Sequence, residues 1–396
     1  MKYKVATISS SSLNALIGPS RNIKRIYENG HLFEECDIKL LGPFCPVLES
    51  ANTNSGGISI KSALKRTIKS VLKTTTKGSW LLYKITYVRH AQNAVSKFIN
   101  DTDGDVDLVV FRDVDSAYEY LQEKSRKPYI FVLHSDGTND MFFSGSAFPK
   151  LRKAKYQSII NSKFEVVCNN ASGLFFLSPR AISNFQRRYP KINTIFGYYH
   201  QGLNKPKVTK RLPKSDLLTF VCVGTICERK NQRSLIEAFA KAKTDKARLV
   251  LVGDGEDSTY CQKKAVDLGI NERIEFLGSQ ENVGNILAVS DVFIMASYDE
   301  GVPNAAVEAM AFGLPLVLTD VGACGDLIDG NGYLIKPRVD EIANAIDAIV
   351  SKYSTDKLER FHERSQEIYF EYYTEEIMCK EHIKMYKKVL LETSSQ

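Results

Sequence analysis

The chain has 396 residues, which is more than one compact hydrophobic core usually holds, so two domains of ordinary size are expected. With 43% hydrophobic and 25% charged residues, the composition is that of a globular protein and excludes a collagen-like or low-complexity chain. The net charge is +7, and no apolar run of about 18 residues occurs, so neither a membrane-spanning helix nor a signal peptide is expected. These features predict a cytoplasmic protein.

Residues 1 to about 200 are predicted to form an irregular α/β half. A helix is expected to open near Asn22, after the turn at Gly18 and Pro19. His134 follows a predicted strand directly, which places a titratable group at a strand's carboxyl end. Strands are expected where short β-branched or aromatic runs are bounded by polar turns, at residues 4–8, 106–111, 129–133, 164–167 and 173–177.

The stretch 51–100 contains no Asp or Glu but many Lys and Arg residues. Between residues 61 and 73, apolar residues recur among these charges at roughly helical spacing. A basic amphipathic helix of this kind can lie on an anionic membrane surface, and the alternative is an ordinary solvated helix face. The residues predicted to contact a membrane are Lys61, Lys65, Arg66, Lys69 and Lys73.

The second half alternates strands and helices regularly, after polar residues 201–216 that are typical of a linker. This alternation predicts a doubly wound parallel sheet, followed by a helical tail over 339–350 and 357–391. Strands are predicted at 217–223, 247–252, 274–277, 292–295, 314–318 and 333–335, with helices at 231–243, 256–268, 283–288 and 303–312.

A candidate phosphate site follows the first strand of the second half. Gly224 and Thr225 leave that strand, and Arg229 and Lys230 lead into the next helix. Backbone N–H groups at a helix start carry partial positive charge and bind phosphate, and two full positive charges would add to this. The pattern predicts a diphosphate site, and the alternative is that both side chains are ordinary surface charges.

A second candidate site is the segment 299–313, which follows the predicted strand 292–295. Ligands of open α/β sheets bind outside the carboxyl ends of the strands, so chemistry is expected here. Glu300 lies in the loop and Glu308 inside the predicted helix. At about 100° per residue, one continuous helix would not place both carboxylates on one face. They can converge on one ligand because Glu300 is on the loop.

Together these motifs resemble the signature series of the family 4 retaining glycosyltransferases, including an E-x7-E pattern at Glu300 and Glu308. The resemblance is specific over residues 217–337, and over the first 200 residues it rests on Gly18, His134 and the strand pattern. The motifs occur in order at matching distances, at residues 223–225 with 229–231, 251–255, 274–278, 300–304 with 308–310, 313–315 and 320–322.

The resemblance implies the GT-B fold, an α/β architecture in which two Rossmann-like domains face each other across a cleft. An acceptor-binding domain is expected at residues 1–203 and a nucleotide-sugar-binding domain at 204–374. The final helices of the family usually return to the first domain, so residues 375–396 are expected to pack there.

Carried onto this sequence, the resemblance implies a role for each matching residue. Glu308 would accept hydrogen bonds from the ribose hydroxyls, and one carboxylate suits two adjacent hydroxyl donors. Arg229 and Lys230 would hold the diphosphate and neutralise the charge that grows on the leaving group. The implied catalytic residues are Glu300, His134, Arg229 and Lys230, the donor-binding residues are Gly224, Thr225, Arg229, Lys230, Gly278, Asn304 and Glu308, and the acceptor-side residues are Gly18 and His134.

The predicted function is a retaining, metal-independent hexosyl- or N-acetylhexosaminyl-transferase. Its donor would be a nucleotide-diphosphate sugar and its acceptor a glycan or a lipid-linked glycan at the cytoplasmic membrane face, as in bacterial surface polysaccharide assembly. No cofactor, metal or nucleic acid is expected, while a peripheral contact with the inner membrane face is. The alternatives are a nucleotide-sugar epimerase, a transferase with a small soluble acceptor, and a non-catalytic subunit that binds a nucleotide sugar.

Overall fold

The computed structural model describes residues 2–9, 18–41, 71–102, 105–124, 126–134, 148–204, 217–352 and 356–394. The chain divides into two compact units, Met1–Tyr199 with Cys379–Gln396 and His200–Met378. It returns to the first unit within helix α15 (Glu375–Ser394). The expected division, after residues 203 and 374, lies four residues from each of these crossings.

The first unit is built on a six-stranded parallel sheet in the order β2-β1-β3-β4-β5-β6. Strands β3, β4 and β5 are buried along their whole length, as expected for a parallel sheet that is covered on both faces. The strands are β1 (Tyr3–Ile8), β2 (Cys36–Leu41), β3 (Leu108–Phe111), β4 (Tyr129–Val132), β5 (Gly173–Phe176) and β6 (Ile195–Tyr198).

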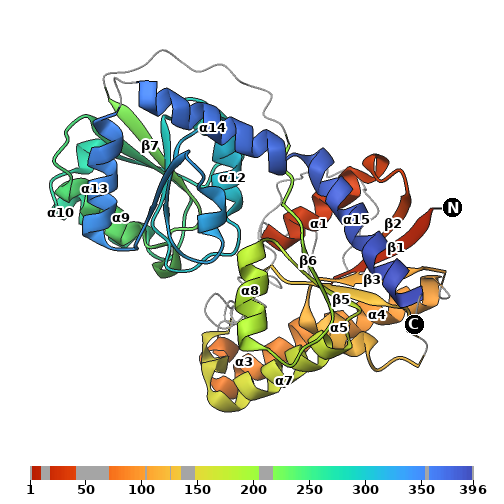
Figure 1. Ribbon diagram of the computed structural model, residues 1–396. Helices are drawn as coiled ribbons and strands as arrows, with labels where there is room; N and C mark the ends of the chain where they lie inside the picture. The colour runs from red at the N-terminus through yellow and green to blue at the C-terminus, as the bar shows by residue number, and fades with distance from the viewer. Residues whose placement is uncertain are drawn as a thin grey trace, which may run out of the picture. The chain divides into compact units, whose positions relative to one another are not determined.

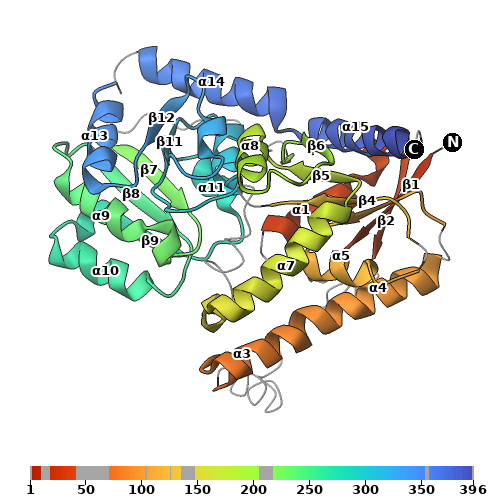
Figure 2. The same cartoon turned by 60° about the horizontal axis from the view of Figure 1, so that its bottom comes forward.

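Helices cover both faces of this sheet (Figure 1). α1 (Gly18–Glu28) and the C-terminal part of α15 lie on one face. A long helix runs below the other face, where α3 (Thr76–Tyr83) continues through a π-helical turn (Lys84–Val88) into α4 (Figure 2). The helices that bury apolar side chains in one core with the sheet are α4 (Arg89–Thr102), α5 (Val114–Tyr120), α7 (Ala154–Asn170) and α8 (Pro179–Arg188).

The strand predicted at residues 164–167 is wrong, because these residues lie inside α7. Ile160, Phe164, Val167 and Cys168 are buried at a spacing of four, three and one residues, which is the pattern of one helix face. Two strands were not predicted, β2 and β6. Both are edge strands of the sheet, and their short segments mix polar residues or glycine with apolar ones.

The second unit contains a parallel sheet in the order β12-β11-β10-β7-β8-β9. α9 (Gln232–Lys241), α10 (Ser258–Asp267) and α13 (Val339–Val350) cover one face of it (Figure 1). The doubly wound sheet predicted for this half is confirmed. The other face carries α11 (Val283–Leu287), α12 (Asn304–Ala311) and α14 (Asp356–Tyr372), and the strands are β7 (Leu218–Val223), β8 (Ala247–Val252), β9 (Ile274–Gly278), β10 (Val292–Met295), β11 (Leu316–Thr319) and β12 (Gly332–Ile335).

The strand order of the second unit reverses between β7 and β10, which pair directly although β8 and β9 separate them in the sequence. Crossover helices on either side of such a switch point leave a crevice at the carboxyl ends of the two strands. The residues that follow β7 and the residues that follow β10 are therefore brought together.

Candidate functional site

The turn that follows β7 packs against the turns of the neighbouring strands, backbone against backbone. Gly224 and Gly253 have φ angles of 149° and 134°, which other residues rarely adopt. A Cβ atom on Gly253 would lie 2.0 Å from the carbonyl oxygen of Gly224. The Gly253 N–H donates to the carbonyl of Gly278 at 2.8 Å, which ties the end of β8 to the end of β9. Glycine is therefore required where these strand ends meet.

Arg229 and Lys230 lie in a 3-10 turn (Glu228–Lys230) that precedes α9, rather than in the helix itself. The helix begins only at Gln232 because Asn231 has a left-handed backbone, with φ of 55°. The Asn231 amide Nδ2 donates to the carbonyl of Ala296 at 2.9 Å, just beyond β10. The Arg229 carbonyl accepts from the Tyr298 N–H at 2.8 Å. These two bonds tie the loop after β7 to the loop after β10.

The two loops meet in an ion cluster formed by Arg229, Lys230 and Glu300. Lys230 Nζ lies 2.6 Å from Glu300 Oε1, and Arg229 Nη1 lies 3.4 Å from the same oxygen. Arg229 Nη1 also donates to the Asp299 carbonyl at 2.7 Å. Glu300 is only 5% exposed, so these interactions are weakly screened by water. Two cations and one carboxylate leave a formal charge of +1, which favours an anionic ligand.

The Glu300 loop is also held from the side of β11. Gly322 has φ of 52°, and a Cβ atom there would lie 1.7 Å from the Glu300 carbonyl oxygen. The Ala323 N–H donates to the Gly301 carbonyl at 3.2 Å. The glycine of the 320–322 motif therefore allows a close backbone contact that fixes the position of Glu300.

The other predicted donor-binding residues lie at the same carboxyl edge of the second sheet. Glu308 is half-buried in α12, which begins at Asn304 with Pro303 as the preceding cap residue. Asn304 Oδ1 is buried and accepts no hydrogen bond within the described part of the chain. Thr225 is exposed, and its carbonyl accepts from Gln232 Nε2 at 3.1 Å. Gly278 ends β9 with φ of 62°.

In the first unit, His134 belongs to a buried cluster around Arg112, a residue that the sequence analysis did not select. Arg112 is only 8% exposed and directly follows β3. Its Nη1 donates to Asn22 Oδ1 at 3.1 Å and to Tyr199 Oη at 2.7 Å, and it lies 3.2 Å from His134 Nε2. Its Nη2 lies 3.3 Å from His382 Nε2. An Arg directly after a buried strand was the available sequence signal.

The Arg112 contact fixes the protonation of His134. A guanidinium group only donates, so the contact with Arg112 favours a neutral His134 ring whose Nε2 faces the guanidinium as an acceptor and whose proton is on Nδ1. Burial, with smaller contributions from the charges of Arg112 and His382, lowers the pKa of His134 well below its usual range. His134 is therefore a neutral ring that offers an Nδ1–H donor. Nδ1 is buried, and no described residue accepts from it.

The remaining predicted residues are Gly18 and the basic residues predicted to contact a membrane. Gly18 opens α1. Lys61, Lys65, Arg66 and Lys69 fall outside the described residues, whereas Lys73 is exposed, with Nζ 5.9 Å from the centroid of the Phe148 ring. No helix in the described ranges is long and apolar enough to cross a bilayer. Within the same ranges, no three His, Cys, Asp or Glu side chains are grouped as metal ligands.

Comparisons with known proteins agree with this geometry. Residues 204–368 match the family described as glycosyl transferases group 1, a range that includes the ion cluster and Glu308. The lipopolysaccharide core biosynthesis glycosyltransferase LpsE of Rhizobium meliloti is 36% identical over 154 residues, which cover 38% of this chain and 45% of LpsE. The chain spans about half the length of the first curated relatives it matches.

Solved structures with low sequence identity share the fold along the whole chain. The sucrose-phosphate synthase of Thermosynechococcus elongatus has a TM-score of 0.73 at 16% identity, covering 99% of this chain and 100% of that chain. The HepE protein of Anabaena, in complex with UDP, has a TM-score of 0.68 at 16% identity, covering 98% and 100%. The chain thus has the GT-B fold, and its residues 204–368 match the glycosyl transferases group 1.

Proposed function

We propose that the protein is a glycosyltransferase that moves a sugar from a nucleotide-diphosphate sugar to a glycan or lipid-linked acceptor in bacterial surface polysaccharide assembly. The observation that carries this proposal is the buried cluster of Arg229, Lys230 and Glu300, at the switch point of a domain that matches group 1. The relative LpsE is named for lipopolysaccharide core biosynthesis, and HepE was solved with UDP. Both names support the same assignment.

The second unit would hold the donor. Arg229 and Lys230 would contact the diphosphate, because their net charge with Glu300 is +1 and both are fixed by the loops around them. Glu308 would accept hydrogen bonds from the ribose hydroxyls. During transfer, negative charge grows on the leaving diphosphate, and cations that are already in position stabilise it without reorganisation. These cations would make a metal unnecessary.

Glu300 would orient Lys230 and lie near the donor sugar. Double displacement uses two carboxylates that flank the scissile bond. Because Glu308 is assigned to the ribose, only Glu300 would remain as a catalytic carboxylate. We therefore favour attack from the face of the leaving group, in which the departing phosphate helps to deprotonate the acceptor and the configuration is retained. The transferred sugar would be a hexose or an N-acetylhexosamine.

The first unit would contribute His134 to sugar binding. Its Nδ1–H can donate to a hydroxyl or ring oxygen of a sugar, and its lowered pKa keeps the ring neutral at physiological pH. A neutral donor suits an uncharged sugar better than a cation does, because it avoids burying a second charge beside Arg112.

A panel of nucleotide sugars tests the proposal directly. Binding would be measured by calorimetry, and slow hydrolysis by NMR of the released sugar. The proposal expects one donor to bind and to be hydrolysed with its anomeric configuration kept. Interconversion of two nucleotide sugars would identify an epimerase, and binding without any turnover in the presence of acceptor extracts would indicate a non-catalytic subunit.

A further inference from the structure

An exposed aromatic residue, Tyr298, lies next to the ion cluster of the second unit. Tyr298 is the third residue after β10 and is 51% exposed, whereas Ser297 before it is fully buried and Glu300 after it is 5% exposed. Single exposed apolar side chains are common on protein surfaces, so exposure by itself does not mark a function. The groups that surround the ring decide whether it is available to a ligand.

The backbone that carries this ring is fixed to the loop that follows β7. The Tyr298 N–H donates to the Arg229 carbonyl at 2.8 Å, and Arg229 Nη1 donates to the Asp299 carbonyl at 2.7 Å. Two residues before the tyrosine, the Ala296 carbonyl accepts from Asn231 Nδ2 at 2.9 Å. A tyrosine side chain has few rotatable bonds, so a ring on a fixed backbone loses little conformational freedom when a ligand covers it.

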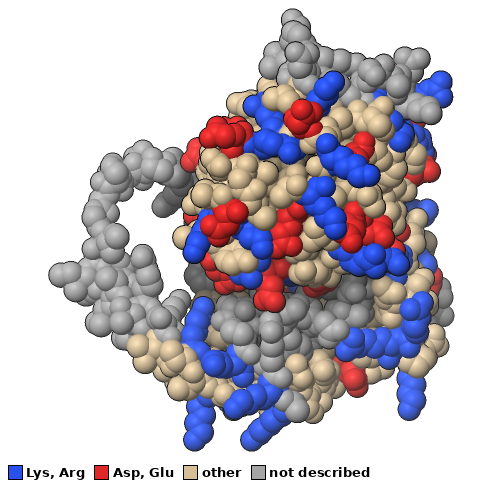
Figure 3. Space-filling model, turned by 90° about the vertical axis from the view of Figure 1, so that its left-hand side faces the viewer, with Lys and Arg blue, Asp and Glu red and all other residues tan. Residues whose placement is uncertain are grey.

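Charge alone does not single out a binding place on the second unit. On the face that Figure 3 shows, basic and acidic side chains are interspersed, and several are paired on or next to α9, α10 and α13. These pairs are Arg233 with Asp257, Lys241 with Asp340, and Lys264 with Glu237. Their charges cancel, whereas the ion cluster beside Tyr298 keeps a formal charge of +1. An anionic ligand would therefore bind at the cluster, where the exposed ring is.

Tyr298 differs from other exposed aromatic residues of the second unit because its ring has no such partner. Tyr260 is 46% exposed, and the Arg233 guanidinium lies over its ring, 4.3 Å from the centroid. Tyr372 is 38% exposed, and its ring centroid lies 5.3 Å from that of His200. Among the described residues, no ring or cation contacts Tyr298 in this way, and none forms a hydrogen bond with its hydroxyl. The ring and the hydroxyl are therefore available to a ligand.

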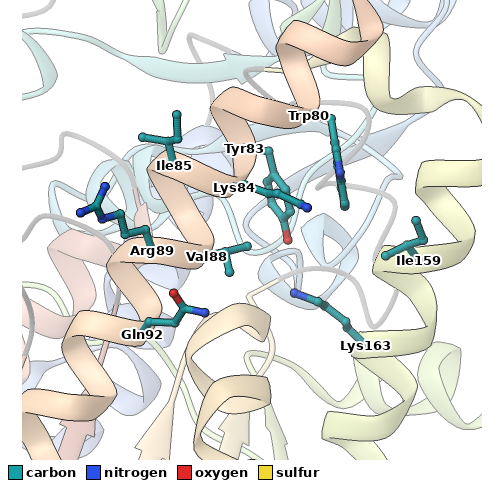
Figure 4. A pocket seen from close by; sticks show the side chains of 9 residues that line it. All are labelled: Trp80, Tyr83, Lys84, Ile85, Val88, Arg89, Gln92, Ile159 and Lys163. Carbon is teal, nitrogen blue, oxygen red and sulfur yellow. The ribbon is translucent and has the colours of Figure 1, made fainter.

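The pocket in Figure 4 shows the opposite case in the first unit. It has a volume of about 460 Å³, and Trp80 and Tyr83 line one side of it. Trp80 stacks on Tyr83 with 5.2 Å between the ring centroids, and its centroid also lies 5.0 Å from that of Tyr156. The Tyr83 hydroxyl donates to Asp115 at 2.7 Å. The aromatic residues of this pocket are thus engaged within the protein, unlike Tyr298.

We propose that Tyr298 is a sugar-binding residue of the donor site, and that its ring stacks on the pyranose ring of the transferred sugar. This rests on the proposed function, in which Arg229 and Lys230 hold the diphosphate. The sugar is bonded to that diphosphate, and Tyr298 is tied to Arg229 and lies two residues from Glu300, which is expected near the sugar. The ribose would be held by Glu308 in α12, at the other end of the diphosphate.

The chemistry of a tyrosine suits this contact. The faces of a pyranose ring present C–H groups with partial positive charge, and the face of an aromatic ring is electron-rich. The phenol hydroxyl can also donate to a sugar hydroxyl or accept from one. A nucleoside diphosphate without a sugar offers neither partner at this position. Tyr298 would therefore distinguish the donor from the nucleotide that remains after transfer.

Calorimetry of the full-length protein with UDP-glucose, UDP-N-acetylglucosamine, GDP-mannose, UDP and GDP tests this role. Tyr298→Ala should bind the nucleotide sugar that the wild type prefers about threefold to tenfold more weakly, which is the scale of one aromatic contact. Its affinity for the diphosphate alone should be unchanged. Tyr298→Phe should keep most of the sugar-dependent affinity. Equal weakening for the nucleotide sugar and its diphosphate, or no weakening for either, would overturn the proposal.

The matched control is Tyr260→Ala, which removes a similarly exposed ring from α10 and should change neither affinity. The same loss in this variant would show a nonspecific effect and contradict the contact at Tyr298. If the wild type binds none of these probes, the proposed donor site fails and the role of Tyr298 fails with it. If the wild type and Tyr298→Ala bind the same nucleotide sugar equally well, only the role of Tyr298 fails.

Discussion

In each unit, the polar residues of the cluster follow strands at the carboxyl edge of a parallel sheet. The two units differ in how they compensate the charge of the central cation. In the second unit, Lys230 is paired with the carboxylate of Glu300 beside Arg229. In the first unit, the described partners of Arg112 are amide, hydroxyl and imidazole groups rather than carboxylates.

The difference indicates which part of the substrates each unit would bind. An ion cluster with a net positive charge attracts a diphosphate, whereas a buried arginine that donates to amide, hydroxyl and imidazole groups leaves the other donors of those groups to bind an uncharged ligand. Two parallel sheets of different strand order can therefore support charge stabilisation on one sheet and hydrogen bonding to sugar on the other. The predictions below test this comparison, beginning with the largest expected effect.

Arg112→Met should destabilise the protein by about 3 kcal/mol or more. The substitution leaves several buried hydrogen-bonding groups without their donor, and each such group costs about 1–3 kcal/mol. Urea denaturation measures the loss. Arg126→Met is the matched control, because Arg126 is exposed and donates only to a backbone carbonyl in the described structure. If both variants lose the same stability, the Arg112 cluster is not a structural centre of the first unit.

Glu300→Gln should lower turnover roughly tenfold to a hundredfold while changing donor affinity much less. The amide no longer holds Lys230 by charge, and small misplacements of a catalytic group cost this much. Steady-state kinetics combined with calorimetry separates the two quantities. Asp257→Asn, which weakens the pair with Arg233 in the same unit, should change neither. Equal losses in turnover and affinity would make Glu300 a binding residue only.

A smaller effect is expected from His134 on the way in which the free energy of unfolding depends on pH. Burial lowers its pKa in the folded state, so below about pH 6.5 the unfolded chain binds a proton that the folded chain does not. The contribution of His134 to stability is therefore present above that pH and is lost as the pH falls. The free energy of unfolding, measured between pH 8 and pH 5, should fall less steeply with falling pH for His134→Gln than for the wild type. Parallel curves would show that folding leaves the pKa of His134 unchanged and would contradict the lowered pKa.

The sequence predicted the second unit better than the first, and the reason is physical. Its strands and helices alternate with clear periods, and the residues of the ion cluster lie directly after strands that were predicted. The pairing of Lys230 with Glu300 depends on the switch between β7 and β10, which no local pattern shows.

In the first unit, residues 164–167 of α7 were predicted as a short strand, because so short a run with three apolar residues does not distinguish the two periods. The Arg112 cluster joins residues of α1 and α15 with residues that follow β3, β4 and β6, and its longest contact, to His382, spans 270 residues. Only His134 among them stood in a recognisable motif, so the rest required the tertiary structure.

The central claim is that Lys230 contacts the diphosphate of the donor, and a double-mutant cycle between protein and ligand tests it most directly. The affinities of the nucleoside diphosphate and monophosphate of the identified donor would be measured by calorimetry for the wild type, Lys230→Ala and the control Lys241→Ala. Lys241 is the last residue of α9, at the other end of the helix from Lys230, and pairs with Asp340 at the surface. Loss of the terminal phosphate should cost the wild type and the control roughly 1.5–3 kcal/mol more than it costs Lys230→Ala. An equal cost in all three proteins would contradict the assignment.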